Sequence, residues 1–98
     1  MKFKLMLSVF IGLLGIIHAQ KADIRGHVYD KGTGEPLAYA SVFLQGTNYG
    51  TITDNDGFFN ISSIPTGDYT IIATFIGYDT SMAILVLKKN QVINKNFS

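Results

Sequence analysis

The sequence predicts an all-β fold: a seven-stranded antiparallel β-sandwich with Greek-key connections, preceded by a signal-peptide helix. Three observations predict it. Short apolar runs alternate with period two, as half-buried strands do. Turn signals rich in glycine separate these runs at intervals of about eight to twelve residues, which is typical of two-sheet sandwiches. No connection is long enough for a helical crossover, so antiparallel pairing is the default.

The first twenty residues have the order of a secretory signal peptide. Two lysines supply a basic start, residues 5–17 form an uncharged apolar run of 13 residues, and Ala19 is a small residue at a plausible cleavage point. Thirteen helical residues span about 20 Å, less than the roughly 30 Å of a hydrocarbon core. We therefore expect a leader over residues 1–19 and a mature domain over residues 20–98. An uncleaved membrane anchor or a buried helix is the weaker alternative.

The first two expected strands flank a loop. Residues 24–29 form the first strand, with Ile24 and Val28 on one face. Residues 30–36 contain two glycines, a proline and three charges, which indicates a loop. The second strand covers residues 39–45 and turns three apolar side chains inward, namely Ala40, Val42 and Leu44.

The third and fourth strands, residues 49–53 and 58–61, are interpreted as the arms of a hairpin. Residues 54–57 (DNDG) separate them and form a strong turn signal. In this turn we expect Asp54 to accept backbone hydrogen bonds as an Asx turn, while Gly57 takes a positive φ. In the fourth strand Phe59 and Ile61 share one face, because side chains alternate.

The last three strands follow a second reversal over residues 64–69. Residues 69–76 form the clearest strand, residues 81–87 the next, and residues 92–97 the last, with Ile93 and Phe97 on one side. The inner face of the fifth strand is mainly apolar and its outer face is mixed, as in the centre of a sandwich. The inner residues are Tyr69, Ile71, Ala73 and Phe75, and the outer ones are Thr70, Ile72, Thr74 and Ile76.

Charge and cysteine content exclude several functional classes. Without the leader the chain has six basic and seven acidic residues, a net charge of −1. No basic patch remains that could release counterions from a nucleic acid, so that class of partner is rejected. The chain contains no cysteine, which excludes a disulfide framework and a lipid-anchored cysteine. Its core, or neighbouring polypeptide, must supply the stability.

Reactive residues are sparse, and we predict no catalytic, cofactor-binding or metal-binding residue. Asp54 and Asp56 before Gly57 resemble the start of a calcium loop, but the third oxygen ligand and the distal glutamate are missing. His27 is the only histidine after the leader, and no Cys, His or Glu lies at ligand spacing from it. An exposed strand histidine is therefore the preferred interpretation. No glycine-rich phosphate loop precedes a helix.

Aromatic residues offer a weaker functional signal. They could stack on sugar rings or dock a partner, although covering loop ends and cross-strand neighbours is the preferred interpretation. These residues are Tyr29, Tyr39, Phe43, Tyr49, Phe58 and Tyr78. Two triplets match the N-glycosylation signal, beginning at Asn60 and Asn96, but both fall in expected strands rather than loops.

An ordered set of turn glycines and inward apolar residues carries a family resemblance. It runs through Gly26-x-Val28-x-Asp30, Thr33-Gly34-Glu35-Pro36-Leu37, Ala40-x-Val42-x-Leu44, Gly46-Thr47, Gly50-Thr51-x-Thr53-Asp54, Gly57-x-Phe59, Ile64-Pro65-x-Gly67-x-Tyr69 and Ile76-Gly77-Tyr78. This pattern resembles the carboxypeptidase regulatory-like domain, a transthyretin-like or prealbumin-like sandwich. The match covers residues 23–97 and is specific for the fold, but these positions are structural and say little about function.

The resemblance implies a context. Such domains often follow the signal peptide of SusC-type TonB-dependent outer-membrane receptors in Bacteroidetes-like bacteria. We therefore expect a non-catalytic periplasmic interaction domain of a receptor for nutrient uptake. Its partner would be a downstream plug and barrel or another envelope protein, and it would meet the membrane only through the barrel. The apolar pattern still runs at Phe97, which favours a fragment of a longer receptor.

Two alternatives stay open. One is a free-standing secreted module that binds carbohydrate or protein through its exposed tyrosines. The other, also implied by the resemblance, is an accessory domain of a metallocarboxypeptidase, whose zinc and catalytic groups lie in another domain. None of those groups is matched in this sequence.

Overall fold

The computed structural model describes residues 20–78 and 80–98. This part contains seven strands: β1 (Lys21–His27), β2 (Ser41–Leu44), β3 (Gly50–Ile52), β4 (Phe58–Pro65), β5 (Gly67–Thr74), β6 (Ser81–Leu87) and β7 (Val92–Asn94). The helix expected in the leader falls on residues 1–19, outside the described residues. Across the two described ranges, no helix combines the length and the hydropathy that a membrane crossing requires.

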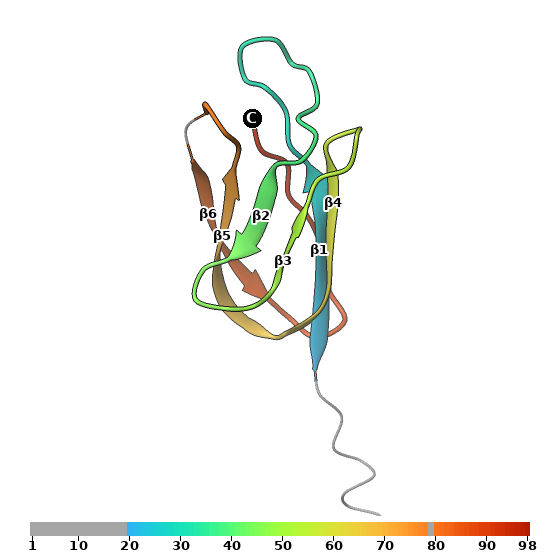
Figure 1. The fold of residues 1–98 in the computed structure, drawn as a ribbon. Coiled ribbons are helices and arrows are strands. Elements are labelled where there is room, and N and C mark those ends of the chain that lie inside the picture. Colours follow the sequence, from blue (N-terminus) through green and yellow to red (C-terminus); the bar gives the residue numbers. More distant parts are fainter. Residues whose placement is uncertain (1–19, 79) are drawn as a thin grey trace, which may run out of the picture.

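The strands form two facing sheets, as the sequence predicts (Figure 1). One sheet has three strands in the order β4-β1-β7, and the other has four in the order β3-β2-β5-β6. The loops after β1, between β3 and β4, and between β5 and β6 lie at one end of the sandwich, together with the carboxyl terminus (Figure 1). The all-β sandwich with seven strands is thereby confirmed.

The core lies between the two sheets and is built from the period-two residues. The side chains of Val42, Leu44 and Ile71 have no exposed area, and Phe59 and Ile61 are also buried. The expected inward face of the second strand is therefore confirmed. The full set of buried apolar residues in this cluster is Ala22, Ile24, Val28, Ala40, Val42, Leu44, Phe59, Ile61, Ile64, Ile71, Ala73, Leu87 and Phe97.

One strand pair departs from the expected antiparallel order. β1 and β7 run parallel, with Ile24 opposite Ile93. A parallel pair needs a long crossover only when its strands follow one another in the chain, and the whole domain separates these two. The pairing continues beyond β7: the Phe97 N–H donates to the His27 carbonyl at 2.9 Å, and the Lys95 N–H donates to the Arg25 carbonyl at 2.8 Å.

The expected hairpin between the third and fourth strands is wrong. β3 pairs with β2, while β4 crosses to the other sheet and pairs with β1. Contacts from distant residues direct this crossing. The buried Thr53 hydroxyl accepts from the Ala40 N–H at 2.9 Å and donates to the Leu37 carbonyl at 2.7 Å. The Gly57 carbonyl then accepts from the Val28 N–H of the opposite sheet at 2.9 Å.

β1 and β4 are longer than expected because they extend together past an irregularity. Ala22 pairs with Ile64, but Ile24 pairs with Ile61, so β4 carries an extra residue there. Ser63 takes a positive φ of 57°, and its N–H donates to Asp23 Oδ1 at 2.9 Å. A side chain of β1 thus satisfies a backbone group at the bulge. The reversal expected from residue 64 begins only after Pro65.

Candidate functional site

The residues with potential for chemistry do not converge. Among residues 20–78 and 80–98, no group of three or more His, Cys, Asp and Glu side chains could hold a metal ion. His27 lies half-buried on β1, with its ring 5.7 Å from Tyr29 and 5.3 Å from Phe58 between centroids. It therefore acts as one member of an aromatic row across β1 and β4.

Asp54 has the structural role that its sequence context predicts. Its Oδ1 accepts the Asp56 N–H at 2.9 Å and the Phe58 N–H at 3.0 Å. Gly57 takes a φ of 74°, and a Cβ atom there would lie 2.6 Å from the Val28 carbonyl oxygen. The Asx turn and the positive φ are both confirmed. One carboxylate oxygen is used to fix the turn between the two sheets.

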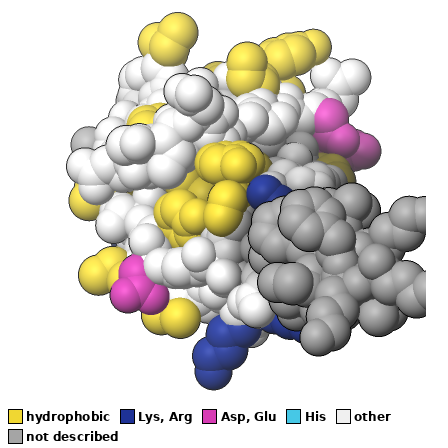
Figure 2. All heavy atoms as spheres, turned by 90° about the horizontal axis from the view of Figure 1, so that it is seen from below, with side chains coloured by type: hydrophobic (Ala, Val, Ile, Leu, Met, Phe, Trp, Pro, Cys, Tyr) yellow, Lys and Arg dark blue, Asp and Glu magenta, His cyan; other side chains and the backbone are white. Residues whose placement is uncertain are grey.

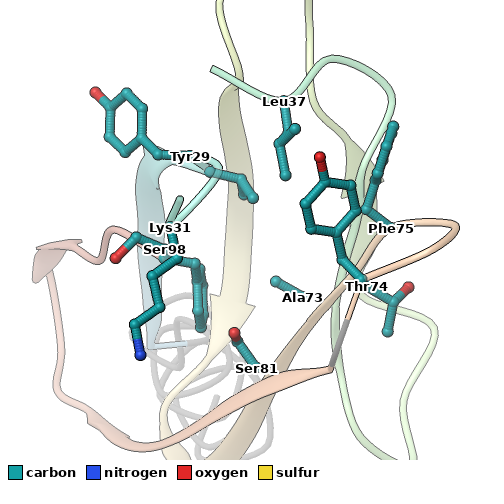
Figure 3. Close-up of a pocket in the computed structure, with 11 residues that line it drawn as sticks. Tyr29, Lys31, Leu37, Ala73, Thr74, Phe75, Ser81 and Ser98 are labelled. Carbon is teal, nitrogen blue, oxygen red and sulfur yellow. The ribbon is translucent and has the colours of Figure 1, made fainter. Parts of the chain in front are cut away.

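A pocket of about 170 Å³ opens at the loop end of the sandwich (Figure 3). Aromatic rings form much of its wall, and Phe75 and Tyr78 contact each other with ring centroids 5.4 Å apart. The Lys31 side chain lies at its border. The lining residues are Val28, Tyr29, Lys31, Leu37, Ala73, Thr74, Phe75, Tyr78, Ser81, Phe97 and Ser98. Tyr29 and Tyr78, two of the aromatic residues with a possible binding role, thus both line this pocket.

A hydrogen bond between two loops borders this pocket. Tyr78 Oη donates to Asp30 Oδ2 at 2.6 Å, across 48 residues of sequence. Asp30 Oδ1 accepts the Gly32 N–H at 2.7 Å, so both carboxylate oxygens are engaged. The hydrogen bond from Tyr78, followed by that from Gly32, lowers the pKa of Asp30. The same bond to Asp30 raises the pKa of Tyr78. The pair joins the loop after β1 to the loop after β5.

The other singled-out aromatics are dispersed. Tyr39 is 71% exposed, and its hydroxyl donates to Asn55 Oδ1 at 3.2 Å. Tyr49 packs against the core, and Phe43 lies on the outer face of β2. At the glycosylation-like triplets, Asn60 donates to Ser62 Oγ at 2.8 Å and Asn96 Oδ1 accepts the His27 N–H at 2.9 Å. These residues do not form one site.

An apolar surface lies on the outer face of β2, β5 and β6, and the sequence pattern alone did not predict it. Met82, Ile84 and Val86 project from β6 with exposed fractions of 62%, 81% and 53%. In the sheet register Ile72 lies between Phe43 and Met82, and this contact explains why it is buried although it points outward. We call Phe43, Ile72, Met82, Ile84 and Val86 the outer apolar face. Its sequence signal is the uncharged segment 81–87, which is apolar at both alternating sets of positions.

The end of the sandwich opposite the loops has fewer features of a binding site. Figure 2 shows apolar side chains at its centre and rim, with few charged ones outside the grey atoms. A more open pocket of about 270 Å³ lies among Lys21, Ala22, Asp23, Asn90, Gln91 and Val92. These are the start of β1 and the turn before β7, without an aromatic wall.

The family model described as CarboxypepD_reg-like domain matches residues 24–98. The chain belongs to the CarboxypepD_reg-like domain family. The carboxypeptidase regulatory-like resemblance is therefore confirmed over nearly the whole described part of the chain.

Two curated relatives of the domain are TonB-dependent receptors. The chain is 38% identical over 93 residues to TonB-dependent receptor SusC of Bacteroides thetaiotaomicron, covering 93% of this chain and 9% of the relative. It is 29% identical over 92 residues to TonB-dependent receptor P39 of Formosa agariphila, covering 94% of this chain and 8% of that relative. The chain thus spans less than a tenth of the length of these receptors.

Solved structures share the fold of this CarboxypepD_reg-like domain at low identity. A type II Cohesin-X-Dockerin complex from Acetivibrio cellulolyticus, an N-terminal interface mutant, matches with a TM-score of 0.61 and 22% identity, over 74% of this chain and 51% of that one. The 5-hydroxyisourate hydrolase of Klebsiella pneumoniae matches with a TM-score of 0.54 and 17% identity, over 74% of this chain and 90% of that one. At these identities the likeness supports the transthyretin-like sandwich and no activity.

Proposed function

We propose that this chain is the non-catalytic, N-terminal interaction domain of a TonB-dependent outer-membrane receptor for nutrient uptake. The observation that carries the proposal is the 38% identity to SusC across 93% of the chain. The domain would be exported by the leader over residues 1–19 and would lie in the periplasm. Its partner would be the plug and barrel of the receptor or another envelope protein, and only the barrel would contact the membrane.

Docking, rather than chemistry, is the mechanism that the residues favour. The positions that define the family pattern shape turns, as Asp54 and Gly57 do, or fill the core, as Val42 and Leu44 do. Three of the exposed apolar side chains, Met82, Ile84 and Val86, lie together on the outer face of β6, at an edge of the four-stranded sheet. An edge strand offers unpaired N–H and C=O groups to another polypeptide.

Export can be tested with the full 98-residue chain carrying a carboxyl-terminal epitope in a Bacteroidetes host. We expect the mature protein in the periplasmic fraction, with Gln20 as its first residue by mass spectrometry. A matched Leu13→Arg variant places a charge in the apolar run of the leader and should remain unprocessed in the cell interior. Cytoplasmic, full-length wild-type protein would contradict the proposal.

The receptor assignment has a separate test in the gene. We expect the reading frame beyond the codon for Ser98 to encode a TonB box, a plug and a barrel. A frame that continues into a metallocarboxypeptidase catalytic domain would instead favour the accessory-domain alternative. Hydrolase activity of the purified chain would remove the non-catalytic part of the proposal.

A second candidate, carbohydrate binding, is favoured by the aromatic pocket at the loop end. Phe75 and Tyr78 could stack on a sugar ring, while the neighbouring polar groups accept hydrogen bonds from the hydroxyl groups of the sugar. A glycan array with the purified chain tests it. Binding that is lost in Tyr78→Ala but kept in Tyr39→Ala, an exposed tyrosine outside the pocket, would support this function. A uniform absence of binding would remove it.

A further inference from the structure

β6 is an unprotected strand edge. The strand order places it at the margin of the four-stranded sheet, with β5 on one side only. It pairs with β5 in an uninterrupted register at all seven positions, from Ser81 opposite Ala73 to Leu87 opposite Gly67. It contains no proline, no glycine and no charged residue. Proteins usually protect edges with these residues, with bulges or with short strands.

The other edges of the described part are protected in those ways. β3 and β7 have three residues each. β4 is long, but it carries the irregularity at Ser63, ends in Pro65 and exposes Asn60 and Ser62. β6 is thus longer than β3 and β7, and it is more regular than β4. It is the edge best suited to accept a further strand.

The outer side chains of β6 point to an apolar occupant. Met82, Ile84 and Val86 stand next to one another on one face and are each more than half exposed. They continue across β5 and β2 through Ile72 and Phe43, so the outer apolar face crosses three strands. Contiguous exposure of this kind marks an interaction surface more often than scattered single residues do. Among the outward-facing residues of β2, β5 and β6, the charged one is Asp68, which lies opposite Val86.

The sequence of β6 is complementary to itself. In an antiparallel pair of two β6 strands centred on Ile84, Met82 of one copy lies opposite Val86 of the other, and Ile84 lies opposite Ile84. On the inner side, Ala83 faces Leu85 and Ser81 faces Leu87. Every pair is free of like charges, and most are apolar on both sides. A two-fold axis through Ile84 therefore generates an isologous interface.

We propose that β6 pairs antiparallel with β6 of a second copy of this chain, so that the two four-stranded sheets join into one eight-stranded sheet. The pairing supplies backbone hydrogen bonds to both edges and brings the outer apolar faces of the two copies side by side. The inference rests on the proposed function only in that the domain acts by docking. A negative result here leaves the export experiment and the gene test unaffected.

The first test is the mass of the purified full chain by light scattering at about 100 μM. We expect twice the monomer mass for the wild type and the monomer mass for Ile84→Lys, which places two ammonium groups opposite each other on the two-fold axis. Ile52→Lys is the matched control, since Ile52 is 61% exposed on the opposite edge of the same sheet. This variant should remain a dimer. A monomeric wild type, or a dimeric Ile84→Lys protein, would overturn the proposal.

A second measurement fixes the register. The chain has no cysteine, so Ile84→Cys introduces a single thiol that would face its own copy across the axis. Directly opposed strand residues have Cα atoms roughly 4.5–5.5 Å apart, within reach of a disulfide. Mild oxidation should convert most Ile84→Cys protein to a covalent dimer and leave Ile52→Cys without a crosslink. Equal crosslinking of both variants would contradict this pairing, as would crosslinking of neither.

Discussion

Replacing Gly26 by alanine tests whether the parallel contact between β1 and β7 holds the sandwich together. A Cβ atom at Gly26 would lie 1.8 Å from the Lys95 carbonyl oxygen and 2.6 Å from its carbonyl carbon. Non-bonded heavy atoms reach their optimal contact at roughly 3.5 Å, so the backbone at Lys95 must move by about 1.7 Å. No side-chain rotation can relieve a contact between two backbones.

That displacement has a calculable cost. It breaks the hydrogen bonds from Lys95 to Arg25 and from Phe97 to His27, each with a net value of about 0.5–1.5 kcal/mol. It also pulls the buried Phe97 ring out of the core, which costs about 1.5–3 kcal/mol. The total cost is about 2.5–6 kcal/mol. Since a domain of this size has a free energy of unfolding of roughly 4–12 kcal/mol, Gly26→Ala should leave it marginally stable or unfolded.

Thermal unfolding followed by circular dichroism measures the effect. At roughly 4–8 °C per kcal/mol for a domain of this size, we expect the Tm to fall by at least about 10 °C. Gly32→Ala is the control, because a Cβ atom there would meet only Asp30 Oδ1, at an ordinary 3.4 Å. Its Tm should stay within a few degrees of the wild type. A Gly26→Ala protein as stable as the Gly32→Ala protein would refute the reasoning.

Three further predictions follow from side-chain hydrogen bonds. Thr53→Val keeps the shape but leaves the Ala40 N–H without its buried acceptor and Leu37 without its donor, so urea unfolding should show a loss of about 2–4 kcal/mol. Asp54→Ala should lose about 1 kcal/mol by the same assay, whereas millimolar Ca²⁺ should not raise the wild-type Tm; a calcium-dependent increase would indicate a bound metal. Tyr78→Phe should raise the pKa of Asp30 toward its ordinary value in an NMR titration. Because the pKa of Asp30 is lowered in the folded state, its stabilising contribution is present above the unfolded pKa and is lost as the pH falls through the folded pKa. An unchanged titration in Tyr78→Phe would contradict the hydrogen bond.

Local patterns in the sequence predict the parts of this fold that depend on neighbouring residues. The inward positions of Val42 and Leu44 follow from alternation, and the turn at Asp54 and Gly57 follows from backbone chemistry within four residues. Which strands pair with one another cannot be predicted from local patterns. β4 leaves β3 because Gly57 bonds to Val28, 29 positions earlier, and no local pattern encodes that choice.

The candidate binding surfaces likewise include features that the sequence predicts and features that it does not. The exposure of Tyr39 and Tyr78 could be anticipated from their places beside loops. The outer apolar face could not, because the alternation in residues 81–87 is apolar at both sets of positions and does not say which set faces water. The register with β5 distinguishes Ile84, which lies opposite Thr70, from Leu85, which lies opposite the inward Tyr69.

The adjacency of the first and last strands bears on how the domain is made. A polypeptide synthesised from its amino terminus presents β1 long before β7, so the smaller sheet cannot be completed until residues 92–97 have emerged. Contacts this distant in sequence form slowly, because a long loop must close first. We expect the nascent polypeptide to remain unfolded until residues 92–97 have been synthesised. For the export proposed above, that delay would keep the domain unfolded during its passage through a translocation channel.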